Sequence, residues 1–199
     1  MSKNGTSKKF VLSRNLVFIF IIIGIPLLAL IIWCISGFVG NNIKSDLADK
    51  FEIEKVEYIK QDDITDFNFV FTLTDCTYAT SDTTGSVKYK AVITNHSNTT
   101  ASSMTMKICV ADYWTHYVSD AKSVTSINPT TSGTTKTGSV SSIAYSNKNG
   151  WGLTKQVSQK PNVYVYLSYT FVDESSKKST KSCVVEYKFS DIFTGAINQ

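Results

Sequence analysis

One uninterrupted apolar stretch near the N-terminus constrains this chain more than any other feature. Residues Leu16 to Val39 contain no charged side chain and a single hydroxyl, that of Ser36. As an α-helix these 24 residues would extend roughly 36 Å, because a helix rises about 1.5 Å per residue. About 20 such residues cross the hydrocarbon core of a bilayer. The sequence therefore predicts one transmembrane helix over residues 16–39, with the membrane lipid bilayer as a partner.

The residues before this stretch predict its orientation. Residues 1–15 carry Lys3, Lys8, Lys9 and Arg14 and no acidic residue. Short basic flanks stay on the cytoplasmic side, so we expect a cytoplasmic tail and an extracytoplasmic remainder. A cleaved secretory signal has an apolar region of only about 7–15 residues and a small-residue cleavage site. The longer run and the absence of such a site favour a retained signal anchor in the plasma membrane.

The formal charge of +4 reflects this tail and not a nucleic-acid surface. The chain has 20 basic and 16 acidic residues, and four of the basic ones precede the apolar stretch. The remainder therefore carries equal numbers of each sign, and we expect no nucleic-acid partner. Lysine supplies every basic residue except Arg14, so the exterior part lacks the bidentate guanidinium groups that bind carboxylates and phosphates.

The exterior part divides into a connection, a domain and a tail. Residues 40–60 mix charged and apolar residues, which predicts a stalk with a short helix from Ser45 and a first strand near Phe51–Ile59. Residues 61–190 form the expected domain, which opens with a turn at Gln61–Asp63. Residues 191–199 are predicted to be a loose tail.

Alternation of apolar and polar residues dominates the domain. Five segments show it clearly: Phe67–Leu73, Val87–Ile93, Met104–Val110, Val163–Phe171 and Cys183–Phe189. Shorter strands are expected around Ser123–Ile127 and Lys136–Ile143, on either side of a loop through Gly133. A period of two with frequent turn residues is typical of half-buried strands. The sequence therefore predicts an all-β fold, an antiparallel β-sandwich preceded by one transmembrane helix.

One of these strands also suggests a family. The segment Tyr89–Asn98, an alternating strand that ends in Asn-His-Ser-Asn, resembles the strand and turn of bacterial membrane-anchored extracytoplasmic immunoglobulin-like domains. Pro129, Gly133 and the following strand resemble the same pattern. The resemblance implies an immunoglobulin-like sandwich that serves in binding or assembly, and it brings no site residues with it.

A search for catalytic groups finds one motif and not its companions. Thr72-Leu-Thr-Asp-Cys76 resembles the cysteine motif of sortases, which also need an earlier histidine and a later arginine. No histidine precedes Cys76, and Arg14 is the only arginine. A thiolate nucleophile needs a neighbour that lowers its pKa. We expect a protein that is not an enzyme, with a cysteine enzyme using Cys76 or Cys109 as the weakest alternative.

Cofactor and metal sites are not expected either. His96 and His116 are the only histidines, and neither stands at metal-ligand spacing from a second ligand. The exterior cysteines, Cys76, Cys109 and Cys183, are odd in number, and their pairing stays open. Cys183 is expected on the apolar face of its strand and Cys109 on the opposite face of its own. Asn95 and Asn98 both match the N-glycosylation pattern, and whether either is modified also stays open.

Aromatic residues supply the candidate contact surface. It comprises Tyr113, Trp114, Tyr117, Trp151, Tyr164 and Tyr166. Tyrosine and tryptophan suit interfaces because they combine apolar area with a polar tip. The alternative is that Tyr164 and Tyr166 are covered within the protein, so that both faces of their strand are buried.

These features favour an interaction module over a catalyst. The first hypothesis is a single-pass membrane-anchored extracytoplasmic interaction module, a subunit or accessory of a surface or envelope assembly with a protein partner. The second is a stand-alone carbohydrate- or envelope-binding surface protein. A flat patch with a polar rim would favour the first, and an exposed row of aromatic side chains the second.

Overall fold

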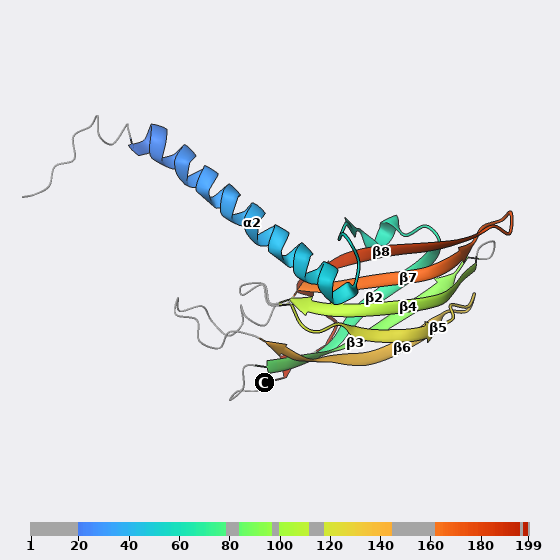
Figure 1. Cartoon of the computed structure of the whole chain (residues 1–199). Helices are drawn as coiled ribbons and strands as arrows, with labels where there is room; N and C mark the ends of the chain where they lie inside the picture. The colour runs from blue at the N-terminus through green and yellow to red at the C-terminus, as the bar shows by residue number, and fades with distance from the viewer. Residues whose placement is uncertain are drawn as a thin grey trace, which may run out of the picture. The chain divides into compact units, whose positions relative to one another are not determined.

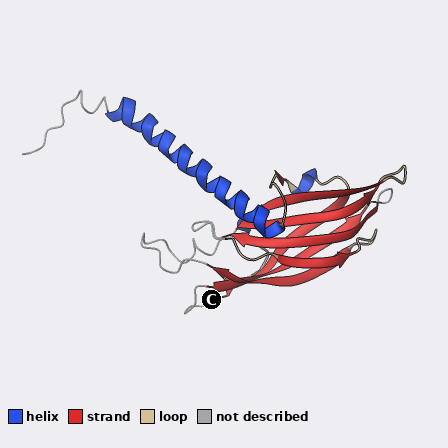
Figure 2. Cartoon of the chain, in the orientation of Figure 1, coloured by secondary structure: helices blue, strands red, loops and turns tan. Residues whose placement is uncertain are grey.

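The chain folds into two compact units, residues Met1–Asn41 and Asn42–Gln199. The computed structural model describes residues 20–78, 84–96, 100–111, 118–144, 162–195 and 197–198. For residues 20, 35–42, 78, 84, 142–144, 197 and 198 only the backbone is described. Figure 1 shows the labelled elements, and Figure 2 shows that strands dominate the second unit.

Helical structure occupies the N-terminal part of the described chain. A π-helical turn, η1 (Phe20–Gly24), leads into the helix α2 (Ile25–Phe51). Pro26 has no N–H to donate, which explains why the hydrogen-bond register changes at this point. Within the described residues, no helix combines the length and the apolar character that a membrane span requires.

Two β-sheets form the second unit. The strands are β1 (Tyr58–Ile59), β2 (Phe67–Tyr78), β3 (Thr84–Asn95), β4 (Thr100–Ala111), β5 (Lys122–Ile127), β6 (Thr134–Ala144), β7 (Asn162–Val172), β8 (Lys178–Lys188) and β9 (Ile197–Asn198). The first sheet has the order β1-β8-β7-β4-β5, and the second has the order β6-β3-β2-β9. A 3-10 turn, η2 (Gln61–Asp63), and a short helix, α4 (Phe189–Ile192), complete the unit.

The long strands pair antiparallel, as the sequence predicts. Strands that are consecutive in the chain pair in two cases, β2 with β3 and β7 with β8. In addition, β4 pairs with β7 and β3 pairs with β6. The two short edge strands differ, because β1 lies parallel to β8 and β9 lies parallel to β2. The β-sandwich is therefore confirmed, with a parallel strand at one edge of each sheet.

An aromatic core fills the space between the sheets. The inward side chains of β2, Phe67, Phe69, Phe71 and Leu73, are all buried, as their alternation predicts. The Phe71 ring stacks on Tyr187 of the opposite sheet, with 5.3 Å between ring centroids. Burial of such side chains contributes the largest favourable term to folding.

Polar groups also tie the two sheets together beside this core. Asp66, the residue before β2, accepts a hydrogen bond from the Tyr169 hydroxyl at 2.9 Å. The Lys181 ammonium lies 2.8 Å and 3.0 Å from the two oxygens of the same carboxylate. Asp66 is 8 % exposed, so its charge is matched where water cannot solvate it fully.

The segment predicted as a stalk, residues 40–60, differs from the prediction in the structure. The helix does not begin at Ser45 but runs continuously to Phe51, and the first strand comprises only Tyr58–Ile59. Leu47 and Phe51 lie one helical turn apart and are both buried, which selects the helix where periodicity alone left the choice open. The helix ends at Phe51. Glu52 follows it with a left-handed φ of 61°, and the Ile53 amide donates to the Ala48 carbonyl at 3.0 Å.

The expected loose tail is also corrected. Residues 189–192 form α4, and Thr194 donates its backbone N–H to the Leu73 carbonyl at 2.9 Å. Strand β9 then pairs with Cys76 and Thr77 of β2. Phe189 stacks on Phe193, with ring centroids 4.5 Å apart, and Ile192 is buried in the core. The tail stays attached to the sandwich because its apolar side chains are removed from water at this contact, which is the hydrophobic effect.

Asn95 fastens the end of β3 to two other segments. Its side-chain amide donates to the carbonyls of Ala101, at 3.2 Å, and Pro129, at 2.8 Å. Its side-chain oxygen accepts from the Ala101 amide at 2.9 Å. The residue is 8 % exposed. Its amide nitrogen is thus used internally, which argues against Asn95 as a glycosylation acceptor, whereas Asn98 lies outside the described residues.

Replacing Asn95 by alanine should destabilise the sandwich. Asn95→Ala leaves the Ala101 amide and the Pro129 carbonyl without these buried partners, which costs about 1–3 kcal/mol per unsatisfied group. Chemical denaturation of the full chain in detergent measures the loss. Asn68→Ala, at an exposed position of β2, is the matched control and should change stability little. Equal stability of the two variants would contradict the role given to Asn95.

Gly195 should be indispensable for attaching the tail. A Cβ atom at this position would lie 1.8 Å from the Thr74 carbonyl oxygen, so Gly195→Ala forces the segment away from β2. We expect faster amide hydrogen exchange in residues 193–198 and at Leu73. Asp191→Ala is the control, since its carboxylate accepts from the adjacent Ser190 hydroxyl. Unchanged exchange in Gly195→Ala would mean that the tail can pass β2 by another route.

Candidate contact surface

The predicted aromatic surface separates into two groups. Tyr113, Trp114, Tyr117 and Trp151 lie outside the described residues. Tyr164 and Tyr166 lie on β7, on the face of the first sheet that points away from the core. Tyr164 is 2 % exposed and Tyr166 is half-buried. Tyr164 is therefore not available to a partner in this structure.

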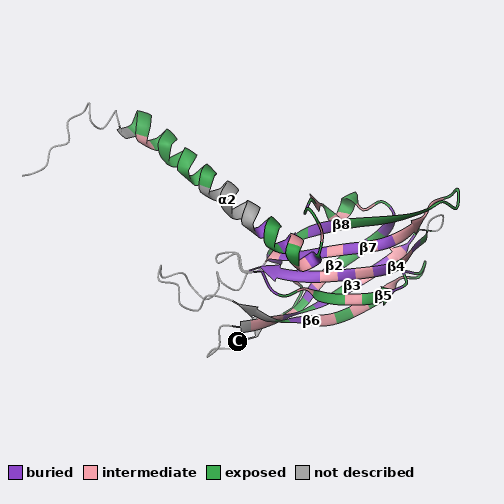
Figure 3. Cartoon of the chain, viewed as in Figure 1, coloured by how far each residue is buried: buried purple, intermediate pink, exposed green. Residues whose placement is uncertain are grey.

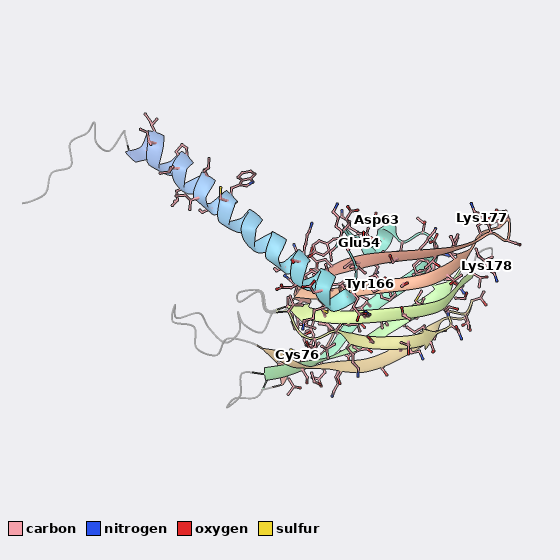
Figure 4. The ribbon with its side chains drawn as sticks, viewed as in Figure 1. Glu54, Asp63, Cys76, Tyr166, Lys177 and Lys178 are labelled. Carbon is pink, nitrogen blue, oxygen red and sulfur yellow. The ribbon has the colours of Figure 1, made fainter. Side chains whose placement is uncertain are left out.

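The end of α2 covers this outer face. Phe51 stacks on Tyr166 with 5.6 Å between ring centroids, and Figure 4 shows Tyr166 beside the last turn of the helix. Tyr58, from the segment that follows, packs on Tyr164 with 5.5 Å between ring centroids. The Tyr164 hydroxyl donates a hydrogen bond to the Glu186 carboxylate at 3.2 Å. Burial raises the pKa of Tyr58 to about 12. The alternative in which these tyrosines are covered within the protein thus applies fully to Tyr164 and partly to Tyr166.

A lysine from the sheet secures the helix end. The Lys107 ammonium, on β4, donates to the Phe51 carbonyl at 2.9 Å and pairs with the Glu52 carboxylate. A cation at this point compensates the partial negative charge of the helix C-terminus. Lys50 and Asp120 form a second ion pair between the helix and the chain after β4. Figure 3 shows the buried positions of this helix end against β4 and β7.

The outer face of the second sheet is uncovered in comparison. Val70 on β2 is 41 % exposed, and it is the only large apolar side chain so exposed among the described residues of the second unit. Val92 on β3 lies directly opposite Val70, and Thr135 on β6 lies opposite Val92. Thr72 and Lys90 form the next row. We call these five residues the open face.

The charge beside the open face is basic. Lys88 pairs with Asp75 at 2.9 Å, and Lys90 is exposed and makes no ion pair among the described residues. Lys136 on the edge strand β6 pairs in register with the buried Ala91, so its side chain starts on the core side of the sheet. The open face is thus a small apolar spot with hydroxyl and ammonium groups around it.

A hollow of about 440 Å³ continues from the open face at the start of β2. Its polar lining comes from Gln61, Asp62, Asn68, Thr94 and His96. Asn68 and Thr94 are a register pair, two positions along the strands from Val70 and Val92 and therefore on the same face of the sheet. Ile64 and the covered rings of Phe67 and Phe69 complete the lining. The volume is in the range of small-molecule sites.

The three cysteines of the second unit are placed as structural side chains. Cys76 and Cys109 are fully buried, and no disulfide joins any of the four cysteines. Cys183 packs against the core, whereas Cys109 lies outside the core cluster, so the two are on opposite faces as predicted. Burial raises the pKa of Cys109 to about 12 and that of Cys183 to about 11. Both thiols are therefore protonated near neutral pH. A nucleophilic cysteine, in contrast, reacts as the thiolate.

Metal-binding groups do not gather in the described residues. There, no three His, Cys, Asp or Glu side chains are close enough to hold an ion. His96 is exposed at the rim of the hollow, and His116 lies outside the described residues.

Sequence reasoning missed both the open face and the hollow. A signal for the open face was present, because Val70 and Val92 are apolar residues at outward positions of alternating strands. The hollow had no such signal, since η2 and β3 meet there only through the fold.

Comparisons with known proteins give no family. No protein-family model matches this sequence, and neither does any curated protein sequence. A structural genomics target is similar at 11% identity and a TM-score of 0.37, over 63% of this chain and 86% of that one.

Two further solved structures show weaker similarity. A protein described as ApaA from Bordetella pertussis matches at 13% identity and a TM-score of 0.32, over 61% of this chain and 92% of its own. A protein described as late embryogenesis abundant matches at 13% identity and a TM-score of 0.27, over 77% and 83%. Similarity at this level carries no argument about function.

The buried thiols give a direct test of their environment. At pH 8 a maleimide reagent should leave Cys109 and Cys183 of the folded chain unmodified and should modify both after unfolding. Because the folded state keeps these protons to a higher pH than the unfolded chain, stability should fall as pH rises above about 9. Mass spectrometry of labelled peptides and denaturation at pH 8 and pH 10 measure the two effects. Rapid native labelling of Cys109 would contradict its burial.

Proposed function

We propose that this protein is a membrane-anchored extracytoplasmic interaction module, a subunit or accessory of a surface assembly, which binds a protein partner through the open face. The observation that carries the proposal is the unequal treatment of the two outer faces. On the first sheet, Tyr58 covers the buried Tyr164 and Phe51 partly covers Tyr166, whereas the second sheet leaves Val70 exposed beside Val92.

The chemistry of the open face suits a protein surface with an acidic group. Val70 and Val92 offer a small apolar centre, and Lys90 offers an exposed ammonium at its edge. Apolar centres with polar rims are common in protein interfaces. A partner with an aliphatic side chain opposite Val70 and a carboxylate opposite Lys90 is complementary to this surface.

Membrane attachment rests on the first unit. Residues Ile21–Ile23, Ile25, Leu27, Leu28 and Leu30–Trp33 expose between 45% and 75% of their surface. A helix that is apolar on all sides needs an apolar environment, which the membrane supplies. The basic residues before it support a cytoplasmic N-terminus.

The sandwich and its sequence pattern support the immunoglobulin-like character of the module. Asn95, within the segment that carries the resemblance, ends β3 and donates hydrogen bonds to the Ala101 and Pro129 carbonyls. The burial of Cys76 and Cys109 speaks against the cysteine-enzyme alternative, because a buried protonated thiol is a poor nucleophile.

Substitution of Val70 should remove the partner. In protein extracted from its native membrane with mild detergent, Val70→Asp should reduce the co-purifying protein at least tenfold. A carboxylate buried against an apolar surface without a counter-charge is costly. Quantitative mass spectrometry of the purified complex measures the ratio.

The matched control is Ser182→Asp, which adds the same charge at an exposed position of the first sheet and should retain the partner. Capture of the partner by Val70→Asp at the wild-type ratio would rule out the open face as the contact. Recovery of the wild-type chain from cells without detergent would contradict the membrane anchor.

A further inference from the structure

The hollow at the start of β2 gathers hydrogen-bonding groups that the fold does not use. Of its five polar side chains, only Gln61 makes a side-chain hydrogen bond within the described part of the chain. Its oxygen accepts from the Tyr187 hydroxyl at 2.8 Å, so its two amide N–H groups stay available. Asp62, Asn68 and His96 are exposed around the same space. A hollow lined by unused donors and acceptors is suited to a polar ligand.

The charges around the hollow restrict the class of ligand. Among the described residues, no lysine or arginine lines it, so a phosphate or carboxylate ligand would meet no lysine or arginine cation there. Asp62 is the only carboxylate in this described lining, which is too few for a calcium or zinc ion. A neutral ligand remains that both donates and accepts hydrogen bonds.

The shape of the lining narrows the class further. Carboxylate and amide groups side by side can accept from and donate to adjacent hydroxyls of one ligand. Ile64, which is partly exposed, provides an apolar contact for the C–H face of a sugar ring. We propose that this hollow binds one or two units of a neutral sugar, with Asp62 and Asn68 as the hydrogen-bonding residues and Ile64 as the apolar contact.

This site is separate from the protein contact proposed for the open face. Asn68 and Thr94 border the open face, but neither belongs to it. The two proposals can therefore fail independently. Asp62→Ala should lose the sugar and keep the protein partner, and Val70→Asp should do the reverse.

Saturation-transfer NMR on the full chain tests the sugar site. The detergent must carry a zwitterionic headgroup, because a maltoside would itself compete for the hollow. The probes are glucose, galactose, N-acetylglucosamine and its β-1,4-linked dimer, with glucuronate and a neutral tripeptide as comparison ligands. We expect at least one neutral sugar to bind with a millimolar dissociation constant, as is usual for so small a ligand. Glucuronate should bind at least tenfold more weakly than that sugar.

Two variants and two controls assign the binding to the hollow. Asp62→Ala and Asn68→Ala should each weaken sugar binding at least tenfold. Glu54→Ala and Thr74→Ala change exposed residues on the neighbouring segment and on the same strand outside the lining, and they should bind as the wild type does. A thermal melt of each variant establishes that it is folded.

Three outcomes would overturn the proposal. Absence of saturation transfer to every sugar is the first. Equal binding by Asp62→Ala, Asn68→Ala and the wild type is the second, since it would place the sugar elsewhere. Binding of the tripeptide without binding of any sugar is the third, and it would identify the hollow as a peptide site.

Discussion

The packing of the helix end on the first sheet is the contact on which the rest of the molecule depends. Phe51 covers Tyr166, and Lys107 holds the Phe51 carbonyl, so the outer face of β7 becomes an interior. Without this cover the first sheet would expose a row of aromatic side chains. With it, the one large apolar side chain left exposed among the described residues of the second unit is Val70, on the opposite sheet. The same contact thus stabilises the sandwich and covers one of its two outer faces.

The alternation of apolar and polar residues predicted the long strands and which of their side chains face the core. Phe67, Phe69, Phe71 and Leu73 alternate with polar residues, and each faces the core as expected. The tail from Asp191 was misread because its apolar residues are few and irregularly spaced, and its binding edge on β2 lies more than a hundred residues earlier. Tertiary contacts of this kind leave no periodic trace in the sequence.

The candidate site was harder to predict for the same reason. Tyr164 and Tyr166 carried a clear signal of apolar area on the second face of a strand, but the signal did not say what covers it. Their cover comes from Phe51, at the end of α2, and from Tyr58 in β1, which both lie in the segment that the sequence had placed in a stalk. Val70 and Val92 were legible as outward apolar residues only once the faces of the sheet were known. The sequence thus showed which residues are apolar or aromatic, but it did not show which of these side chains are exposed on the folded surface.

The two edges of the second sheet affect whether this sheet can pair edge to edge with the sheet of a second copy. Strand β9 pairs with the Cys76–Thr77 end of β2, and Phe193 and Thr194 meet Leu73 on the same side. At the other edge, β6 carries Lys136 on the core side, where an incoming strand would have to bury it. Inward charges and short covering strands are known to suppress edge-to-edge aggregation. The second sheet can therefore leave Val70 exposed without offering a free, flat edge to a second copy of the chain.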